Sequence, residues 1–514
     1  MNTITQSKSE LRKVHHVTQT IVNGVYLDAL KKLKSRDGKI SKKLIEAFVQ
    51  VKLNGLGYYN IMIAGTGIGK THHVIQEFNH IMYNEGIRLS FIVAPETMLT
   101  SEEALGKHIK VLRKKLGGNL DVSYSPSISE IRNKLKRRDT DEMLLFVLSD
   151  KKFNMIINEI VVEIEKHNLI EKTFFSFDEC HISGTSEAIN YYQNNGLKNP
   201  NAGCVKFSNI EKILDICYVL GVSATLIKEQ FDAEFGSDRY RLLNNGFTKE
   251  EIGFVVSGHK PTMFYDEDTQ SRDNTLMQFL GYVLSEQLRY ESMHDNYIGN
   301  KIGSEKLLQK LTGAIILETQ YKDNDKDDIK WFKGFMNQPS MTIPSNWDFD
   351  VALDTSDEMG VWRFRDGKIT ELTRDEELQN GYDTSDSLIA AMSDTESKLK
   401  FLVLVGKGSV GMDILPLNFL LSMRTFTNKF EGTPITHRAE QLLGRCRRLV
   451  LTIEELAPFF DDVEQFIKYY TTINSYQAFL PNREYWKVAQ SIIDDKYPSE
   501  DEIASMLRRA IGKC

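Results

Sequence analysis

Short apolar runs alternate with longer amphipathic stretches along most of the chain. In the first half these runs cover residues 61–64, 90–94, 144–148, 173–177 and 216–222. Short continuous apolar runs are typical of strands that are buried on both faces, and amphipathic stretches between them are typical of crossover helices. The pattern therefore predicts a parallel α/β sheet in the first half of the chain.

A second series of apolar runs follows, at residues 314–317, 349–353, 402–405 and 419–422, and predicts a second α/β unit. Before the first series, apolar residues recur at helical spacing among lysines, which indicates a helical segment. Between the two series the sequence is mixed and polar, so we interpret it as a linker or insertion. We therefore expect an N-terminal helical segment at residues 1–55 and a first α/β domain at 56–235. A linker or insertion at 236–305 then leads to a second α/β domain at 306–475 and a C-terminal helical segment at 476–514.

Length, composition and charge limit the class of protein to which the chain can belong. A chain of 514 residues has room for about three compact units, or for two domains with substantial additions. No apolar run approaches the roughly 20 residues that a membrane span needs, and the first residues lack the apolar core of a secretory signal, so we expect a cytoplasmic protein with no membrane partner. Five scattered cysteines without a C-x-x-C pair argue against a zinc site. A net charge of −7 means that any nucleic-acid surface is a local patch.

A glycine-rich sequence follows the first apolar run. It reads Gly65-Thr66-Gly67-Ile68-Gly69-Lys70-Thr71. Glycines let backbone N–H groups approach phosphates, the next helix adds a favourable dipole, Lys70 reaches the β- and γ-phosphates, and Thr71 offers its hydroxyl to Mg²⁺. The alternative interpretation is a tight strand-to-helix turn without a ligand. The preceding apolar strand favours a phosphate-binding loop.

Two consecutive carboxylates, Asp178 and Glu179, follow the apolar run 173–177. Ligands of open α/β sheets bind at the carboxyl ends of the strands. Asp178 is suited to hold the Mg²⁺ that Thr71 also binds, and Glu179 is suited to polarise the attacking water. Two acids after a strand also start loops or cap helices, but the upstream phosphate loop favours the catalytic interpretation.

These motifs resemble those of the superfamily 2 helicases, the DEAD-box and DExH-box group. The sequence from Ala64 to Thr71 resembles motif I, Asp178-Glu179-Cys180-His181 resembles motif II in its D-E-x-H form, and Ser223-Ala224-Thr225 resembles motif III. In the second half, residues 408–414 resemble motif V, and residues 441–448, with the pattern Q-x-x-G-R-x-x-R, resemble motif VI. The resemblance spans most of the chain and rests on the order of five motifs.

The resemblance implies two tandem RecA-like P-loop domains with parallel sheets, which hydrolyse ATP between them and act on DNA or RNA. Two arginines three residues apart on a helix share a face, so a planar cation can reach a γ-phosphate bound by the other domain. The implied catalytic residues are Lys70, Glu179, Arg445 and Arg448. The residues implied to bind ATP and Mg²⁺ are Gly65, Thr66, Gly67, Ile68, Gly69, Lys70, Thr71, Asp178, Gly411, Asp413 and Gln441, with Thr71 and Asp178 as metal ligands.

Two positions depart from the family pattern, because Thr97 stands where motif Ia commonly has arginine and Leu415 separates motif V from its proline, Pro416. Basic runs at residues 107–115 and 134–138 are candidates for contacts with a nucleic-acid backbone. A solvated helix face explains such runs equally well.

Three classes of function remain after this comparison. The first is a helicase or translocase whose ATPase is switched on by nucleic acid. The second is the motor subunit of a restriction or defence nuclease, in which a partner chain cuts. The third is a P-loop protein that binds nucleotide as a conformational switch. The full set of lysine, acid and arginines favours the first class, since a binding module needs neither Glu179 nor Arg448.

Overall fold

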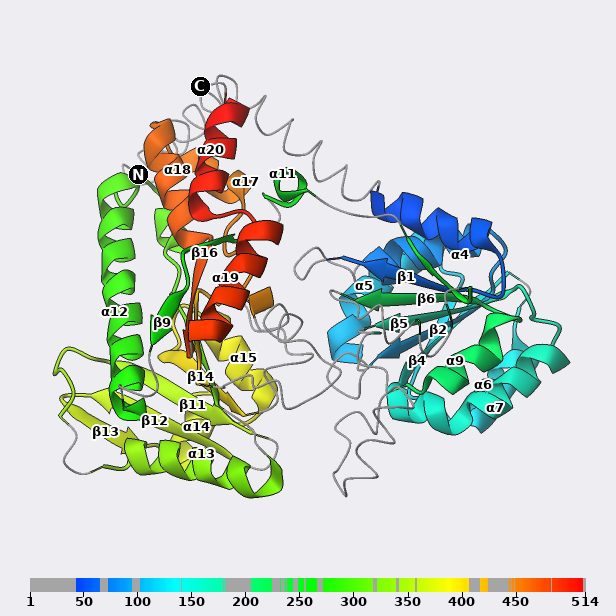
Figure 1. Cartoon of the computed structure of the whole chain (residues 1–514), viewed down its shortest axis with the longest axis horizontal. Coiled ribbons are helices and arrows are strands. Elements are labelled where there is room, and N and C mark those ends of the chain that lie inside the picture. The colour runs from blue at the N-terminus through cyan, green and yellow to red at the C-terminus, as the bar shows by residue number, and fades with distance from the viewer. Residues whose placement is uncertain are drawn as a thin grey trace, which may run out of the picture. The chain divides into compact units, whose positions relative to one another are not determined.

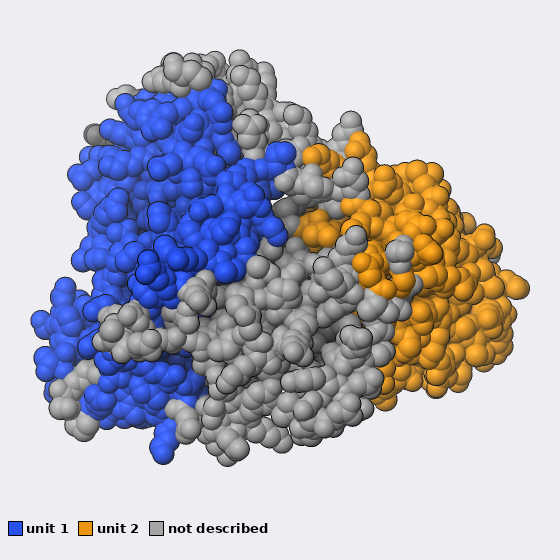
Figure 2. All heavy atoms as spheres, viewed as in Figure 1, with its two compact units in different colours: residues 1–37, 248–429, 438–514 blue, residues 38–247, 430–437 orange. Residues whose placement is uncertain are grey.

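The computed structural model shows two α/β units (Figure 1). The residues that it describes are 43–64, 73–94, 102–139, 141–178, 180, 205–223, 232, 236, 238–243, 248–253, 256–265, 271–317, 321–338, 342–355, 358–405, 417–423, 443–444, 446–447, 449–481 and 483–511. Unit 2 takes its described residues from 43–243 and unit 1 from 248–511, coloured orange and blue in Figure 2.

Unit 2 is built on a seven-stranded parallel sheet with the order β3-β4-β2-β5-β6-β1-β7. The strands are β1 (Tyr59–Ile63), β2 (Leu89–Ala94), β3 (Leu120–Tyr124), β4 (Met143–Ser149), β5 (Thr173–Asp178), β6 (Tyr218–Ser223) and β7 (Tyr240–Leu242). Each apolar run of the first series lies on a strand of this sheet, which confirms the predicted fold class for this half of the chain.

Helices cover both faces of the sheet of unit 2 (Figure 1). One face carries η2 (Val74–Phe78), α4 (Asn79–Asn84) and α5 (Glu102–Lys115), and the other carries α6 (Ile128–Arg137), α7 (Asp150–Lys166) and α9 (Phe207–Leu214). Residues 43–54 are also helical. Ser127 and Ser149 cap α6 and α7, because each side chain accepts a hydrogen bond from a backbone N–H of the first turn.

Unit 1 contains a mixed nine-stranded sheet with the order β13-β12-β11-β14-β10-β15-β16-β8, and β9 also pairs with β16. The strands are β8 (Gly258–His259), β9 (Met263–Tyr265), β10 (Gly313–Leu317), β11 (Phe349–Asp354), β12 (Met359–Arg365), β13 (Lys368–Glu371), β14 (Leu399–Val405), β15 (Phe419–Ser422) and β16 (Ser475–Pro481). The pairings of β12 with β11 and β13 are antiparallel, and the others are parallel. The parallel part of the sheet is the second RecA-like sheet.

Most of the helices of unit 1 contribute to one large apolar core on this sheet. The helices of the unit are α11 (Lys249–Ile252), α12 (Arg272–Tyr297), η5 (Ser304–Leu307), α13 (Tyr321–Met336), α14 (Arg374–Gln379), α15 (Ser385–Ser393), α17 (Ile453–Leu456), η7 (Ala457–Phe459), α18 (Val463–Ile473), α19 (Arg483–Lys496) and α20 (Glu500–Ile511). Capping boxes at Thr373, Thr384 and Thr452 fix the starts of α14, α15 and α17.

The segment expected to be a linker or insertion, residues 236–305, contributes to both sheets. It supplies β7 to unit 2, and β8, β9 and α12 to unit 1. The strands in it have two or three residues each, too few to show a period. The buried side of α12 includes the polar residues Gln287 and His294, which hide its amphipathic pattern. Residues 476–481 likewise lie in β16, ahead of the C-terminal helices.

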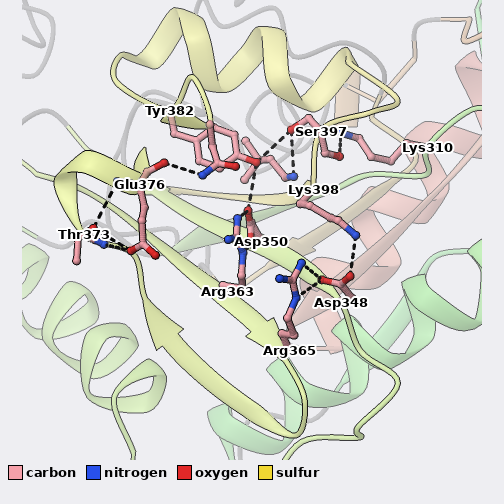
Figure 3. Close-up of polar contacts among 12 residues, drawn as sticks. Lys310, Asp348, Asp350, Arg363, Arg365, Thr373, Glu376, Tyr382, Ser397 and Lys398 are labelled. Atoms are coloured by element: carbon pink, nitrogen blue, oxygen red, sulfur yellow. Dashed lines mark hydrogen bonds and ion pairs between the residues drawn. The ribbon is translucent and has the colours of Figure 1, made fainter. Parts of the chain in front are cut away.

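A polar cluster fastens the antiparallel hairpin of β12 and β13 to the parallel sheet (Figure 3). The carboxylate of Asp350 is fully buried at the start of β11. It accepts two hydrogen bonds of 2.8 Å from the Arg363 guanidinium and one of 3.2 Å from the Tyr382 hydroxyl. The hydrogen bond and charge of Asp350 raise the pKa of Arg363. This ion pair therefore joins strand β11 to β12 and to the loop after α14.

Replacing Asp350 with alanine is expected to destabilise unit 1 by about 3–5 kcal/mol, because a half-buried guanidinium and a buried phenol lose their acceptor. Asp348→Ala is a matched control, since Asp348 is 42% exposed and pairs with Arg365 and Lys398 at the surface. The control is expected to cost about 0–1 kcal/mol. All four tryptophans, Trp331, Trp347, Trp362 and Trp486, belong to unit 1, so their fluorescence during urea unfolding measures this unit. Equal shifts of the two variants would contradict the assignment.

Candidate nucleotide site

Four neighbouring strands of unit 2 end at the same edge of the sheet. Ile63 of β1 lies beside Ser223 of β6, and the Ala64 N–H donates a 2.9 Å hydrogen bond to the Ser223 carbonyl. Asp178, the last residue of β5, lies beside Val222 of β6. On the other side of β5, β2 ends level with it at Ala94. The ends of β1, β5 and β6 lead into motifs I, II and III, and β2 leads into the segment that departs from motif Ia.

The parallel register explains why the strands that lead into these motifs end at one edge of the sheet. In a parallel sheet all the carboxyl ends lie on one side, and ligands of α/β folds bind there. The phosphate loop follows Ala64 directly, motif II starts at Asp178, and motif III starts at Ser223. The sheet order β2-β5-β6-β1 therefore brings the starts of motifs I, II and III to adjacent strands.

Asp178 is the one predicted nucleotide-site residue that lies within the described residues. Its side chain is half-buried at the end of β5. The other predicted residues, Gly65, Thr66, Gly67, Ile68, Gly69, Lys70, Thr71, Glu179, Gly411, Asp413, Gln441, Arg445 and Arg448, lie outside the described residues. An Asp carboxylate at this edge fits a magnesium ligand, because Mg²⁺ takes oxygen ligands and is bound through one or two carboxylates together with substrate phosphates.

Sequence reasoning missed a tyrosine beneath this edge. Tyr59 is fully buried at the start of β1, and its ring packs edge-on against Phe177 of β5 at 6.1 Å. Burial and the nearby Cys180 raise the pKa of the Tyr59 phenol well above its usual value. Cys180, two residues after Asp178, is itself buried. The Tyr59 ring thus supports both the end of β5 and the first turn of motif II.

The sequence signal for this contact is Gly221, an isolated glycine in an apolar strand. A Cβ atom at Gly221 would lie 2.5 Å from the Tyr59 hydroxyl oxygen, closer than real Cβ contacts. Glycine in the interior of a strand often marks the close approach of another group. Here the missing side chain of Gly221 leaves room for the Tyr59 ring against β6, the strand that leads into motif III.

In unit 1, the carboxyl ends of four parallel strands also share an edge. Leu317 of β10 lies beside Val405 of β14, Ile316 lies beside Ser422 of β15, and Asp354 of β11 lies beside Leu404. Motif V begins three residues after the end of β14 in the sequence. The second sheet therefore starts motif V at its carboxyl edge, as the first sheet does for motifs I to III.

Motif VI is anchored to unit 1 through Arg447. This side chain is fully buried, its guanidinium lies 3.1 Å from the centre of the Tyr497 ring, and its carbonyl accepts a hydrogen bond from the Ser257 N–H. Burial raises the pKa of Tyr476 on β16, while the charge and hydrogen bond of Arg447 lower it. Arg447 occupies an unspecified position of the motif VI pattern, so the sequence did not distinguish it from the flanking arginines. Its surroundings indicate a structural role.

Two absences hold for the part of the chain that the structure describes. Among these residues there is no group of three or more His, Cys, Asp and Glu side chains that could hold a metal ion. Their helices include none that is long and apolar enough to cross a membrane.

No protein-family model and no curated protein matches the sequence. Several solved structures resemble the fold. Dbp5 of S. cerevisiae bound to RNA and ADP BeF3 is 12% identical, with 88% of this chain and 89% of that chain covered and a TM-score of 0.38. The helicase MrfA bound to DNA is 12% identical, with 88% and 51% covered and a TM-score of 0.45. The ATP-dependent Type ISP restriction-modification enzyme LlaBIII bound to DNA is 12% identical, with 90% and 33% covered and a TM-score of 0.41.

These TM-scores are all below 0.5, so the order and direction of the strands carry the assignment of the fold. Both sheets have a parallel core, and in unit 2 the strand of motif III lies between the strands of motifs I and II. The chain has the fold of two RecA-like units that its resemblance to the superfamily 2 helicases implies.

Proposed function

We propose that this chain is an ATP-dependent helicase or translocase that hydrolyses ATP and moves on a nucleic acid. The observation that supports the proposal most is the convergence of motifs I, II and III on the adjacent strands β1, β6 and β5 of one parallel sheet. An unrelated glycine-rich turn has no reason to begin beside a strand that leads into motif III, with an aspartate at the end of the strand after that.

The proposal assigns a step of hydrolysis to each motif. The phosphate loop holds the β- and γ-phosphates through its backbone N–H groups and Lys70, and Thr71 and Asp178 hold Mg²⁺. Glu179 positions the attacking water and accepts its proton. Arg445 and Arg448 stabilise negative charge on the transferring phosphoryl group in the same catalytic cycle. Gly411, Asp413 and Gln441 complete the nucleotide contacts that the family resemblance implies.

Turnover of ATP with and without single-stranded DNA, duplex DNA and RNA tests the function. We expect at least one polynucleotide to raise the rate of ATP hydrolysis. This stimulation is expected to weaken as the salt concentration rises, because the protein contacts mainly the phosphates of the polynucleotide. Analysis of the nucleic acid after the reaction completes the assay. A rate that no polynucleotide changes would favour a nucleotide switch, and cleaved products would favour a nuclease motor.

A further inference from the structure

The helix α5 presents a strongly basic face to solvent. Its buried side consists of apolar residues at helical spacing, Leu105, Ile109 and Leu112, which pack on β2 and β4. On the opposite side lie Lys107, Lys110 and Lys114, three exposed side chains at spacings of three and four residues. Residues three or four apart share a helix face, so these lysines form one stripe along the helix. We call them the α5 lysine stripe.

Glu103, one turn before Lys107, is the acidic residue nearest to the stripe in the sequence. No acidic residue occurs in the sequence between Glu103 and Asp121. In the part of the chain that the structure describes, the lysines of the stripe form no ion pair, whereas Lys115, beside it on the helix, pairs with Glu77. The stripe is therefore a local excess of positive charge on a chain whose net charge is −7.

The second basic run, residues 134–138 at the end of α6, has more acidic neighbours than the α5 lysine stripe. Arg132, two residues before this run, pairs with the buried Glu163 at 2.7 Å, and Lys134 within it pairs with Asp121 at 2.6 Å. Lys136 and Arg137 form no ion pair within the described residues. The open surface pocket beside α6 is lined by carboxylates as well as by basic groups. Acidic neighbours repel a phosphate backbone and compete for the basic side chains. The two basic runs are thus equivalent in sequence but differ in structure.

The stripe runs along α5 towards the carboxyl edge of the sheet of unit 2. The chain leaves that edge after β2, returns along α5, and enters the parallel strand β3 at the opposite edge. Lys107 therefore lies towards the carboxyl edge and Lys114 towards the amino edge. At 1.5 Å of rise per residue, the stripe spans about 10 Å along the helix axis.

We propose that the α5 lysine stripe binds the phosphate backbone of a single-stranded polynucleotide on its way to the carboxyl edge of unit 2. Lysine is depleted in protein–protein interfaces, whose cores use aromatic residues, methionine and arginine. The exposed face of α5 offers lysines with Val111 as its single exposed large apolar residue. Such a face fits a chain of phosphates better than a protein partner. This inference rests on the proposed function and names one of its contact surfaces.

The test compares two triple variants of the full chain. The first replaces Lys107, Lys110 and Lys114 with glutamine. The control replaces the exposed residues Lys136, Arg137 and Lys151 with glutamine, on the helices α6 and α7 that cover the other face of the sheet. Both variants remove three positive charges from unit 2. The probe is a fluorescent single-stranded oligonucleotide of mixed sequence, as DNA and as RNA, titrated at several salt concentrations.

We expect the stripe variant to lower the slope of log Kd against log salt by about 2, since each phosphate contact on a single strand contributes about 0.7. The half-saturating polynucleotide concentration for ATPase stimulation is expected to rise, with the basal rate unchanged. The control is expected to keep the slope of the unmodified chain. An unchanged slope in the stripe variant, or equal losses in both variants, overturns the assignment of the stripe. If the unmodified chain itself neither binds the probe nor is stimulated by it, the proposed function fails as well.

Discussion

Replacing Lys70 with alanine is expected to abolish ATP hydrolysis and to leave both units folded. In the proposed site, Lys70 is the cation that reaches the β- and γ-phosphates, where negative charge develops during phosphoryl transfer. The core of unit 2 does not depend on it, because the strand before the phosphate loop is held by buried residues such as Tyr59 and Ile61. Circular dichroism and single-turnover hydrolysis of the same preparation measure the two expectations separately.

Two further variants make this result specific. Lys166→Ala removes an exposed lysine from the last turn of α7 and is expected to retain normal turnover. Glu179→Gln is expected to retain nucleotide binding and to lose turnover by a factor on the order of a hundred or more, because it removes the base but no phosphate contact. Near-normal hydrolysis by a folded Lys70→Ala protein would end the phosphate-loop interpretation. Loss of nucleotide binding in Glu179→Gln would reassign that residue to a structural role.

Short, mostly apolar runs predicted the central strands of both sheets, because strands buried on both faces carry few polar residues. Strands in other environments were not predicted. The strand β3 at the edge of its sheet alternates Asp121 and Ser123 with apolar residues, and its middle is only partly buried. The hairpin of β12 and β13 turns at Asp366-Gly367, where both residues have positive φ. An Asp-Gly pair between two strands is a strong hairpin signal. The expectation of parallel strands alone did not include this hairpin.

In the candidate site, too, the features that the sequence pattern shows were predicted, and those that depend on packing were not. The position of Asp178 at the end of a strand could be predicted, since an apolar run that stops at a carboxylate is visible in the sequence. The support from Tyr59 could not, because that contact depends on how β1, β6 and β5 lie side by side. Likewise, nothing in the spacing of three arginines near motif VI indicates that Arg447 is buried against Tyr497. Long-range packing decides these roles.

Arg448→Ala is expected to lower single-turnover hydrolysis by about 10³-fold or more, by analogy with other arginines that stabilise a transferring phosphoryl group. The affinity for ATP in the ground state is expected to change much less, because the arginine acts chiefly in the transition state. Arg448→Lys is not expected to restore full activity, since a point charge lacks the planar fork of a guanidinium. Arg374→Ala, at an exposed arginine of the same unit, is the matched control.

The variants Arg445→Ala and Arg448→Ala together test whether the two units act on one nucleotide. If both arginines stabilise the same phosphoryl group, the loss in the double variant is smaller than the product of the single losses. Arg447 must stay unchanged in this series, because its buried guanidinium holds the segment in unit 1 and its removal would confuse unfolding with lost catalysis. Tryptophan fluorescence confirms that each variant of unit 1 is folded. Near-normal, polynucleotide-stimulated rates in both single variants would show that the arginines of the second unit do not serve the nucleotide site of the first.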